Sequence, residues 1–215
     1  MQTIDDQQPL GHGDKLERLT PLLREVLEVL GEDPDRTGLR MTPERWGRAL
    51  LTYTQGLDHD PEEHLRVIFQ LDEDDYPVDS DDMIIVDNIE FTSTCEHHMA
   101  PIRGIAHVGY IPNPSSRIIT GLSKLSRVVD VFARRLQVQE QLTQQVARAI
   151  DQHLSPLGVI VVVQAVHYCM IQRGVEQRAS TTLTTARRGA FRARPELESK
   201  FQEYLRLRTA ASPRY

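Results

Sequence analysis

The chain has 215 residues, a net charge of −6, and hydrophobic and charged contents of 40% and 26%, which are ordinary for a folded protein of one domain with an appended segment. No apolar run approaches the roughly 20 residues of a membrane span, and the first residues lack the basic and apolar regions of a signal peptide. We therefore expect a cytoplasmic protein without a membrane partner. The negative charge argues against nonspecific binding to nucleic acid.

The chain is predicted to have three parts. Residues 1–13 are polar and are expected to form a flexible tail. Residues 14–70 carry helical patterns and form a helical N-terminal segment, whereas residues 71–215 mix strands and helices. The acidic stretch Asp72-Glu73-Asp74-Asp75 at this boundary is expected to be a solvated loop. Helices grouped apart from strands indicate an α+β architecture.

Two helices are predicted in the N-terminal segment. Thr20-Pro21 resembles a cap and first residue, and the helix would end near Leu30. Alternatively, apolar residues from Leu16 onwards extend a kinked helix backwards. Thr42-Pro43 resembles the cap and first residue of a second helix that runs towards Gly56.

The period of the apolar residues predicts the elements of the third part. Strands are expected at residues 83–91, 104–111, 159–173 and 180–185, and helices at residues 125–136, 142–154 and 196–208. If the strand that begins at Val159 continues to Arg173, then His167, Cys169 and Arg173 face the same side, because side chains in a strand alternate with period two.

The two cysteines of the chain each have a histidine close by in the sequence. Cys95 precedes His97 and His98 by two and three residues, and Cys169 follows His167 by two. Two cysteines and one histidine are a ligand set that zinc uses when its fourth position stays open for water, as in catalytic sites. Free cysteines are often just buried, but a histidine beside each one favours a metal site. The residues leave open whether His97 or His98 binds; the other one and His167 are candidate proton donors.

A predicted helix start after Gly121 is suited to an anion. Ser123 is expected to cap the helix, and Lys124 and Arg127 lie on one face of its first turn. The alternative is a solvated helix start without a ligand. Further candidate cations are Arg173, Arg45 and Arg48.

Gln139 and Glu140 stand at the start of the following helix. A glutamate in a first turn is expected simply as a partner of the helix dipole. Alternatively, its carboxylate accepts paired N–H groups from a flat heterocycle, a pairing that selects guanine.

Four blocks of the sequence closely resemble GTP cyclohydrolase I, in the order and spacing of that family. They are Thr92-Ser93-Thr94-Cys95-Glu96-His97-His98, Gly121-Leu122-Ser123-Lys124, Val138-Gln139-Glu140-Gln141-Leu142-Thr143, and Ala165-Val166-His167-Tyr168-Cys169 with Arg173-Gly174. Residues 36–39, 42–45 and 181–191 also match, so the resemblance covers about residues 15–208.

The resemblance implies a role for each candidate site residue. One zinc ion per subunit would be held by Cys95, His98 and Cys169, and the acid–base histidines would be His97 and His167. The guanine ring of the substrate GTP would be bound by Glu140, with Gln139 and Ser123 nearby. The triphosphate would be held by Lys124, Arg127 and Arg173, with Arg45 and Arg48 as further candidates.

The resemblance also implies an activity and an assembly. The implied reaction converts GTP and water to formate and 7,8-dihydroneopterin triphosphate. The implied structure is the tunnelling fold, an antiparallel sheet with two helices on one side, assembled as a decamer of two stacked pentamers with active sites between subunits. The alternative is a zinc-binding tunnelling-fold module that has lost catalysis and serves assembly or regulation; retention of His97, His167 and Glu140 argues against it. A nucleoside deaminase or a zinc finger would need a Cys-x-x-Cys pair, which the sequence lacks.

Two positions depart from the pattern of the family. Ile105 stands where relatives often carry Lys or Arg, and Ala186 replaces a common serine. Neither matches an implied zinc or acid–base position, so both bear on packing or binding and not on the reaction.

Overall fold

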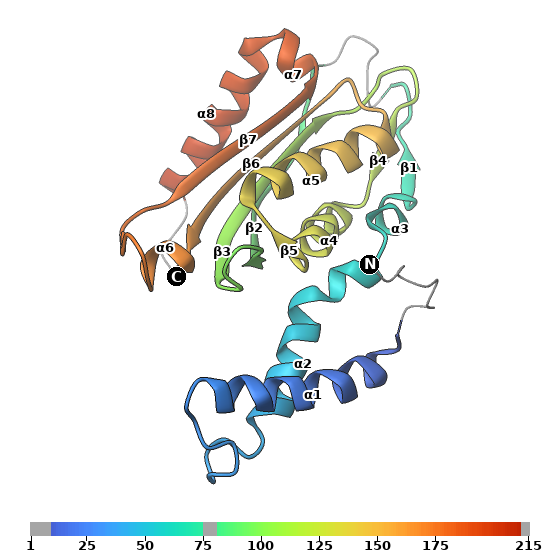
Figure 1. Cartoon of the computed structure of the whole chain (residues 1–215). Helices are drawn as coiled ribbons and strands as arrows, with labels where there is room; N and C mark the ends of the chain where they lie inside the picture. The colour runs from blue at the N-terminus through green and yellow to red at the C-terminus, as the bar shows by residue number, and fades with distance from the viewer. Residues whose placement is uncertain (1–9, 75–80, 212–215) are drawn as a thin grey trace, which may run out of the picture. The chain divides into compact units, whose positions relative to one another are not determined.

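The computed structural model describes residues 10–74 and 81–211, with side chains up to residue 207, and the chain divides after Gln55 into two compact units (Figure 1). The boundary between the units falls earlier in the chain than the predicted one at residue 70, and the domain assignment stays a prediction. Of the predicted tail, residues 1–9 lie outside the described part, as does Asp75 of the acidic stretch.

The first unit consists of two helices, α1 (His12–Val29) and α2 (Thr42–Thr54). The predicted cap at Thr20-Pro21 is wrong, because α1 begins at His12 and continues through Pro21. Inside the helix, the Thr20 hydroxyl donates to the Leu16 carbonyl at 2.9 Å, one helical turn back, as serine and threonine do within helices and not at their caps. The alternative of an earlier start is therefore confirmed.

The second unit is built on a five-stranded sheet in the order β5-β2-β3-β6-β7. Its long strands are β2 (Ile84–Cys95), β3 (Pro101–Ile111), β6 (Gly158–His167) and β7 (Thr182–Gly189), and each pair of neighbours among them is antiparallel. The short β5 (Leu136–Gln137) runs parallel to the end of β2. The strands predicted at 83–91 and 104–111 are confirmed and are longer than expected.

Helices α4 (Leu122–Ala133) and α5 (Gln139–Leu154) cover one face of this sheet, and α8 (Pro195–Ala211) lies on the other (Figure 1). Alternate strand residues such as Phe91, Val108 and Val161 are buried together with the apolar stripes of α4 and α5. On the opposite face, Phe201 of α8 packs so closely that a Cβ on Gly109 would lie 2.8 Å from its ring. The predicted α+β architecture, with two helices on one side of an antiparallel sheet, is confirmed.

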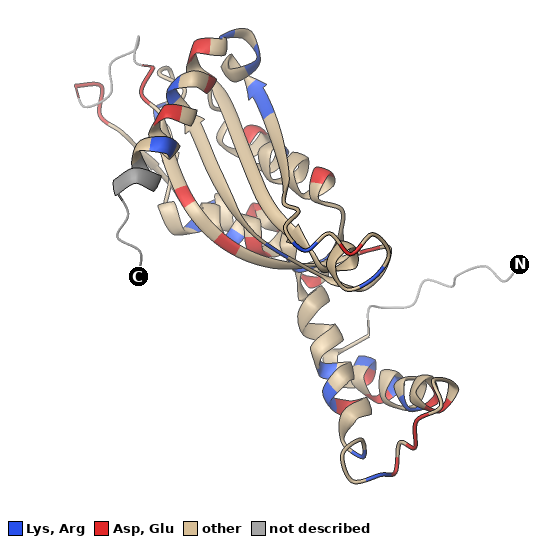
Figure 2. Ribbon diagram, turned by 90° about the vertical axis from the view of Figure 1, so that its left-hand side faces the viewer, with Lys and Arg blue, Asp and Glu red and all other residues tan. Residues whose placement is uncertain are grey.

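Inner strand β6 is largely apolar because most of it is covered on both faces. It carries no charged residue, and most of its side chains are buried. In Figure 2 the strands are accordingly mostly uncharged, whereas α8 carries charges of both signs. Within residues 10–74 and 81–211, we find no helix with the length and apolar character needed to cross a membrane.

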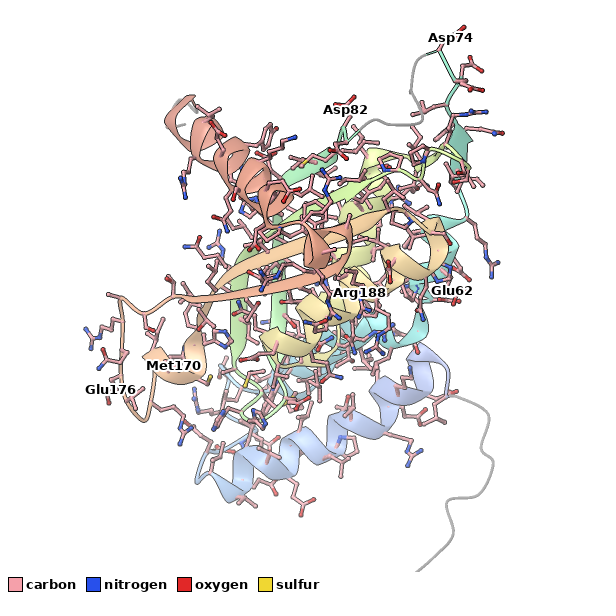
Figure 3. All side chains as sticks on the ribbon, turned by 90° about the horizontal axis from the view of Figure 1, so that it is seen from above. Glu62, Asp74, Asp82, Met170, Glu176 and Arg188 are labelled. Carbon is pink, nitrogen blue, oxygen red and sulfur yellow. The ribbon has the colours of Figure 1, made fainter. Side chains whose placement is uncertain are left out.

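The predicted continuation of β6 to Arg173 is wrong. The strand ends at His167, and residues Tyr168–Ile171 form a helical turn, α6. The reason is that the neighbouring strand β3 begins at Pro101 and its Ile102 already pairs with His167, so the ladder offers no partner further along. Met170 of α6 therefore lies at the end of the sheet opposite to Asp82 (Figure 3).

The remaining elements of the second unit are short. They are η1 (Gln55–Asp58), α3 (Pro61–Leu65), β1 (Ile68–Gln70), β4 (Ile118–Thr120) and α7 (Ala190–Ala193). Strands β1 and β4 pair with each other, and α3 packs against α4 and α5. Asp60 caps α3, because its side chain accepts a hydrogen bond from the Glu62 N–H at 2.9 Å.

Candidate active site

Two segments far apart in the sequence bring Cys95, His98 and Cys169 together. Their ligand atoms all lie within 4.8 Å of one another, and the Cys95 sulfur is 3.8 Å from His98 Nδ1. Cys95 is the last residue of β2 and is held there by pairing with Gln137 of β5, and Cys169 lies on α6 just beyond the end of β6. The three side chains form a group that can hold a metal ion.

The turn between β2 and β3 brings His98 to the cysteines. The Cys95 N–H donates to the Ala100 carbonyl at 2.8 Å, and the Cys95 carbonyl accepts from the Met99 N–H at 2.9 Å. Met99 has a left-handed backbone with φ of 52°, which closes this tight reversal. His97 remains on the outside of the turn, 62% exposed, with its Nε2 3.7 Å from the Glu96 carboxylate. The geometry thus separates two histidines that the spacing left equivalent.

The charges of the cluster fit a cation. Burial and the adjacent Cys95 thiol raise the pKa of Cys169 above its ordinary value, and the charge of Arg173 acts in the opposite direction. Two neighbouring thiols do not readily ionise together because their negative charges repel, whereas a divalent cation between them favours the deprotonation of both. Two thiolates, one imidazole and an open side are the donor set of catalytic zinc.

His167 ends β6 next to the first turn of α5. Its Nε2 lies 2.7 Å from the side-chain oxygen of Gln139, which is buried. Burial lowers the pKa of His167, and the negative charge of the Glu140 carboxylate acts against this shift. Glu140 itself is exposed. Gln139, expected near the guanine, has its side chain bonded to groups of the protein.

The start of α4 differs from the prediction in its cap. The helix begins at Leu122, and Gly121 occupies the cap position, so Ser123 is not the N-cap and lies exposed in the first turn. Gly121 has the extended backbone of an N-cap, with φ of −62° and ψ of 135°, and Ser123, two residues later, is already part of the helix. Lys124 is half-buried and Arg127 is exposed on this helix.

One histidine near these two cations was not predicted from the sequence. His64 on α3 faces α4, and its pKa is lowered by burial and then by the charges of Arg127 and Lys124. The charge of Glu63 raises this pKa, and His59 lowers it. The Asp60 cap could have revealed α3, but no local signal shows that α3 packs on α4.

Three further candidate cations have different surroundings. Arg173 is exposed in the loop after α6, where its charge reaches Cys169. Arg45 and Arg48 are exposed on α2 of the first unit, and Arg48 forms an ion pair with Glu44 one helical turn away. A role for these arginines in substrate binding stays a prediction.

Comparison with known proteins assigns the family. The family model described as GTP cyclohydrolase I matches residues 20–206. The chain belongs to this family. It is 51% identical over 175 residues to the GTP cyclohydrolase 1 of Thermobifida fusca, covering 81% of each chain. It is 49% identical over 190 residues to that of Streptomyces coelicolor, covering 88% of this chain and 90% of the relative. It is 52% identical over 190 residues to that of Porphyromonas gingivalis ATCC 33277, covering 88% and 92%.

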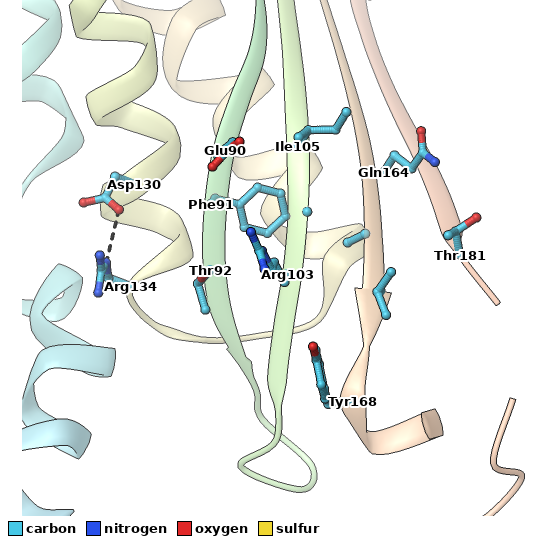
Figure 4. Close-up of a pocket in the computed structure, with 13 residues that line it drawn as sticks. Glu90, Phe91, Thr92, Arg103, Ile105, Asp130, Arg134, Gln164, Tyr168 and Thr181 are labelled. Carbon is cyan, nitrogen blue, oxygen red and sulfur yellow. Dashed lines mark hydrogen bonds and ion pairs between the residues drawn. The ribbon is translucent and has the colours of Figure 1, made fainter. Parts of the chain in front are cut away.

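As a member of the GTP cyclohydrolase I family, the chain is a hydrolase, and its sheet with α4 and α5 is the tunnelling fold. Both departures from the family pattern have clear positions in this fold. Ala186 is buried in the apolar core between sheet and helices. Ile105 lines an open pocket of about 770 Å³ next to Glu90, Arg103 and Gln164 (Figure 4). The first departure therefore affects packing, and the second makes one wall of this pocket apolar.

Proposed function

We propose that the chain hydrolyses GTP to formate and 7,8-dihydroneopterin triphosphate, with one zinc ion per subunit held by Cys95, His98 and Cys169. The observation that carries this proposal is the convergence of these three ligands, next to His167, in a chain of the GTP cyclohydrolase I family. A bound zinc ion would supply Lewis acidity, which makes water a nucleophile near neutral pH.

The two remaining histidines would move the protons. Burial lowers the pKa of His167 and so favours its neutral form, which can accept a proton during attack on carbon 8 of the purine and return it to the ring nitrogen. His97 is exposed on its turn and can exchange protons with solvent. The pair thus provides one sheltered and one solvent-linked acid–base group.

Glu140 would select guanine. Its exposed carboxylate can accept two hydrogen bonds, from N1–H and from the 2-amino group of the base. Adenine presents an acceptor at N1, which would face the carboxylate without a proton between them. A base bound to Glu140 would be held next to the residue whose side chain contacts His167, because Gln139 directly precedes Glu140.

Lys124, Arg127 and Arg173 would hold the triphosphate. The first two stand at the start of α4, where the helix dipole also favours an anion, and α3 adds His64 beside them. Positive charge gathered at this helix start is unfavourable without an anion, which supports binding of a phosphate chain here.

We also propose the assembly expected of the family, a decamer of two pentamers with active sites between subunits. Within the described residues, the sheet has two edges that are largely open. At one edge, β7 pairs only with β6 among the described strands. At the other edge, β2 pairs with the short β5 only at Thr94 and Cys95. Two open edges on one sheet favour pairing between copies. Ten chains of 24.5 kDa would give a particle of about 245 kDa, measurable by sedimentation.

The test is turnover by zinc-loaded protein. We expect about one zinc per chain, formate release from GTP, and a product that becomes fluorescent on oxidation. Glu140→Ala should raise KM for GTP, whereas Glu203→Ala, which removes an exposed carboxylate on α8, should not. If zinc-loaded protein yields neither formate nor pterin fluorescence, the enzymatic proposal fails and the inactive zinc-binding module takes its place.

A further inference from the structure

We propose that Gln139 is a positioning residue that determines which nitrogen of His167 carries the proton. Its side-chain oxygen accepts a hydrogen bond from His167 Nε2, so the neutral imidazole is protonated at Nε2 and presents the lone pair of Nδ1 to the substrate. The inference rests on the proposed function in one respect, that His167 is a proton-transfer residue.

The contacts of the Gln139 amide determine its orientation. Its nitrogen lies 3.0 Å from the Val163 carbonyl, 3.1 Å from the Thr182 carbonyl and 3.1 Å from the Thr184 hydroxyl. Backbone carbonyls only accept hydrogen bonds, so the group facing two of them must be the NH₂. The opposite side of the amide, its oxygen, therefore faces His167 at 2.7 Å.

The tautomer of His167 follows from this orientation. An amide oxygen has no proton to donate, so the ring nitrogen that contacts it must carry one. In a neutral imidazole with a proton on Nε2, the other nitrogen, Nδ1, is the proton acceptor. His167 is thus prepared to act as a base through Nδ1.

Burial and a second layer of contacts hold the amide in place. Gln139 is 1% exposed, so solvent cannot readily replace a lost partner, and an unsatisfied buried polar group costs about 1–3 kcal/mol. The Thr143 hydroxyl donates to the backbone carbonyl of Gln139 at 2.7 Å and lies 2.6 Å from the Thr184 hydroxyl, which in turn contacts the side-chain amide of Gln139. The amide is therefore held by β6, β7 and α5 together, which explains a function for Thr184 in the threonine-rich strand.

The direct test is the protonation pattern of His167 in the zinc-loaded full chain. Solid-state ¹⁵N NMR of protein labelled at histidine distinguishes the two neutral tautomers, and the spectrum of His167→Asn assigns the resonances. At pH 8, above the ordinary histidine pKa of about 6.5, we expect the proton on Nε2. A proton on Nδ1 in the unmodified protein overturns the proposal, and this reading needs no variant at Gln139.

Variants test whether Gln139 is the cause. Gln139→Leu removes the acceptor that faces Nε2 and should shift His167 towards the other tautomer. The control Gln141→Leu alters an exposed glutamine two positions further along α5 and should leave the spectrum unchanged. An unchanged tautomer in a folded Gln139→Leu protein would show that another group determines it.

Kinetics separates positioning from substrate contact. Loss of a partner that orients a functional histidine costs about 10- to 100-fold, so Gln139→Leu should lower kcat by this factor with KM for GTP and zinc content near those of the unmodified protein. A raised KM with unchanged kcat would instead show that Gln139 binds the substrate. If the unmodified protein carries the proton on Nε2 but shows no turnover, the proposed function fails, whereas the assignment of the His167 tautomer stands.

Discussion

Replacing His98 by alanine should weaken zinc binding, whereas replacing His97 should not. His98 Nδ1 is 3.8 Å from the Cys95 sulfur and within 4.8 Å of both thiols. The His97 ring centroid lies 6.2 Å from that of His98, and its side chain is 62% exposed. The two variants are a matched pair, because they remove the same imidazole from adjacent residues of one turn.

The size of the effect follows from the number of ligands. Zinc held by four protein ligands in zinc-finger peptides is bound by about 10–16 kcal/mol, so the share of one ligand is about 2.5–4 kcal/mol. At 1.4 kcal/mol per tenfold change, His98→Ala should weaken zinc binding about 10²- to 10³-fold. The Cys95 and Cys169 thiols remain, so residual binding is expected.

Zinc affinity is measured by competition with a chromophoric chelator, and metal content by mass spectrometry. His167→Ala should retain the metal and lose turnover, because His167 contacts Gln139 and is not part of the ligand group. Equal metal loss in His97→Ala and His98→Ala, or in His167→Ala and His98→Ala, would refute the division of roles derived from this turn.

Three further predictions address the core, pH and substrate charge. Phe201→Ala empties a fully buried site and should lower the free energy of unfolding by about 3–5 kcal/mol, whereas Leu207→Ala, 65% exposed, should change it by less than about 0.5 kcal/mol; denaturant titration decides. Burial lowers the pKa of His107 in the folded protein. As the pH drops below about 6.5, the unfolded chain therefore protonates this histidine more readily than the folded protein does, and the free energy of unfolding should fall. His107→Gln should flatten that slope; an unchanged slope would contradict the assignment. Lys124→Ala should raise KM for GTP about 10- to 100-fold, since hydrogen bonds to charged groups contribute about 1.5–3 kcal/mol, while Arg148→Ala, exposed on α5, serves as the unaffected control.

Local patterns in the sequence were sufficient for most of the architecture. The apolar stripes that predicted helices at 125–136 and 142–154 correspond to α4 and α5, and the apolar run from Val159 corresponds to β6. Such patterns succeed because the period of the apolar residues reports which side of each element is buried. The end of β6 was missed because it depends on where its neighbour β3 begins.

Contacts between distant residues required the tertiary structure. Gln139 at a helix start looked available to a ligand, yet its side chain is buried against β6 and β7. The charges of Arg127 and Lys124 act on His64 because α3 packs on α4. Neither fact has a local signal, since each depends on which elements the core brings together.

By itself, the sequence determined the ligand types, a histidine beside each of two cysteines, and hence the chemistry of a metal site. Only the tertiary structure decided that Cys95 and Cys169 meet, because β3 pairs with both β2 and β6 and so brings the end of β2 near the end of β6. It also decided that His98 and not His97 faces the sulfur atoms. The reason is the turn after β2, in which the Cys95 carbonyl accepts from the Met99 N–H and Met99 is left-handed, and which carries His98 Nδ1 to 3.8 Å from the Cys95 sulfur.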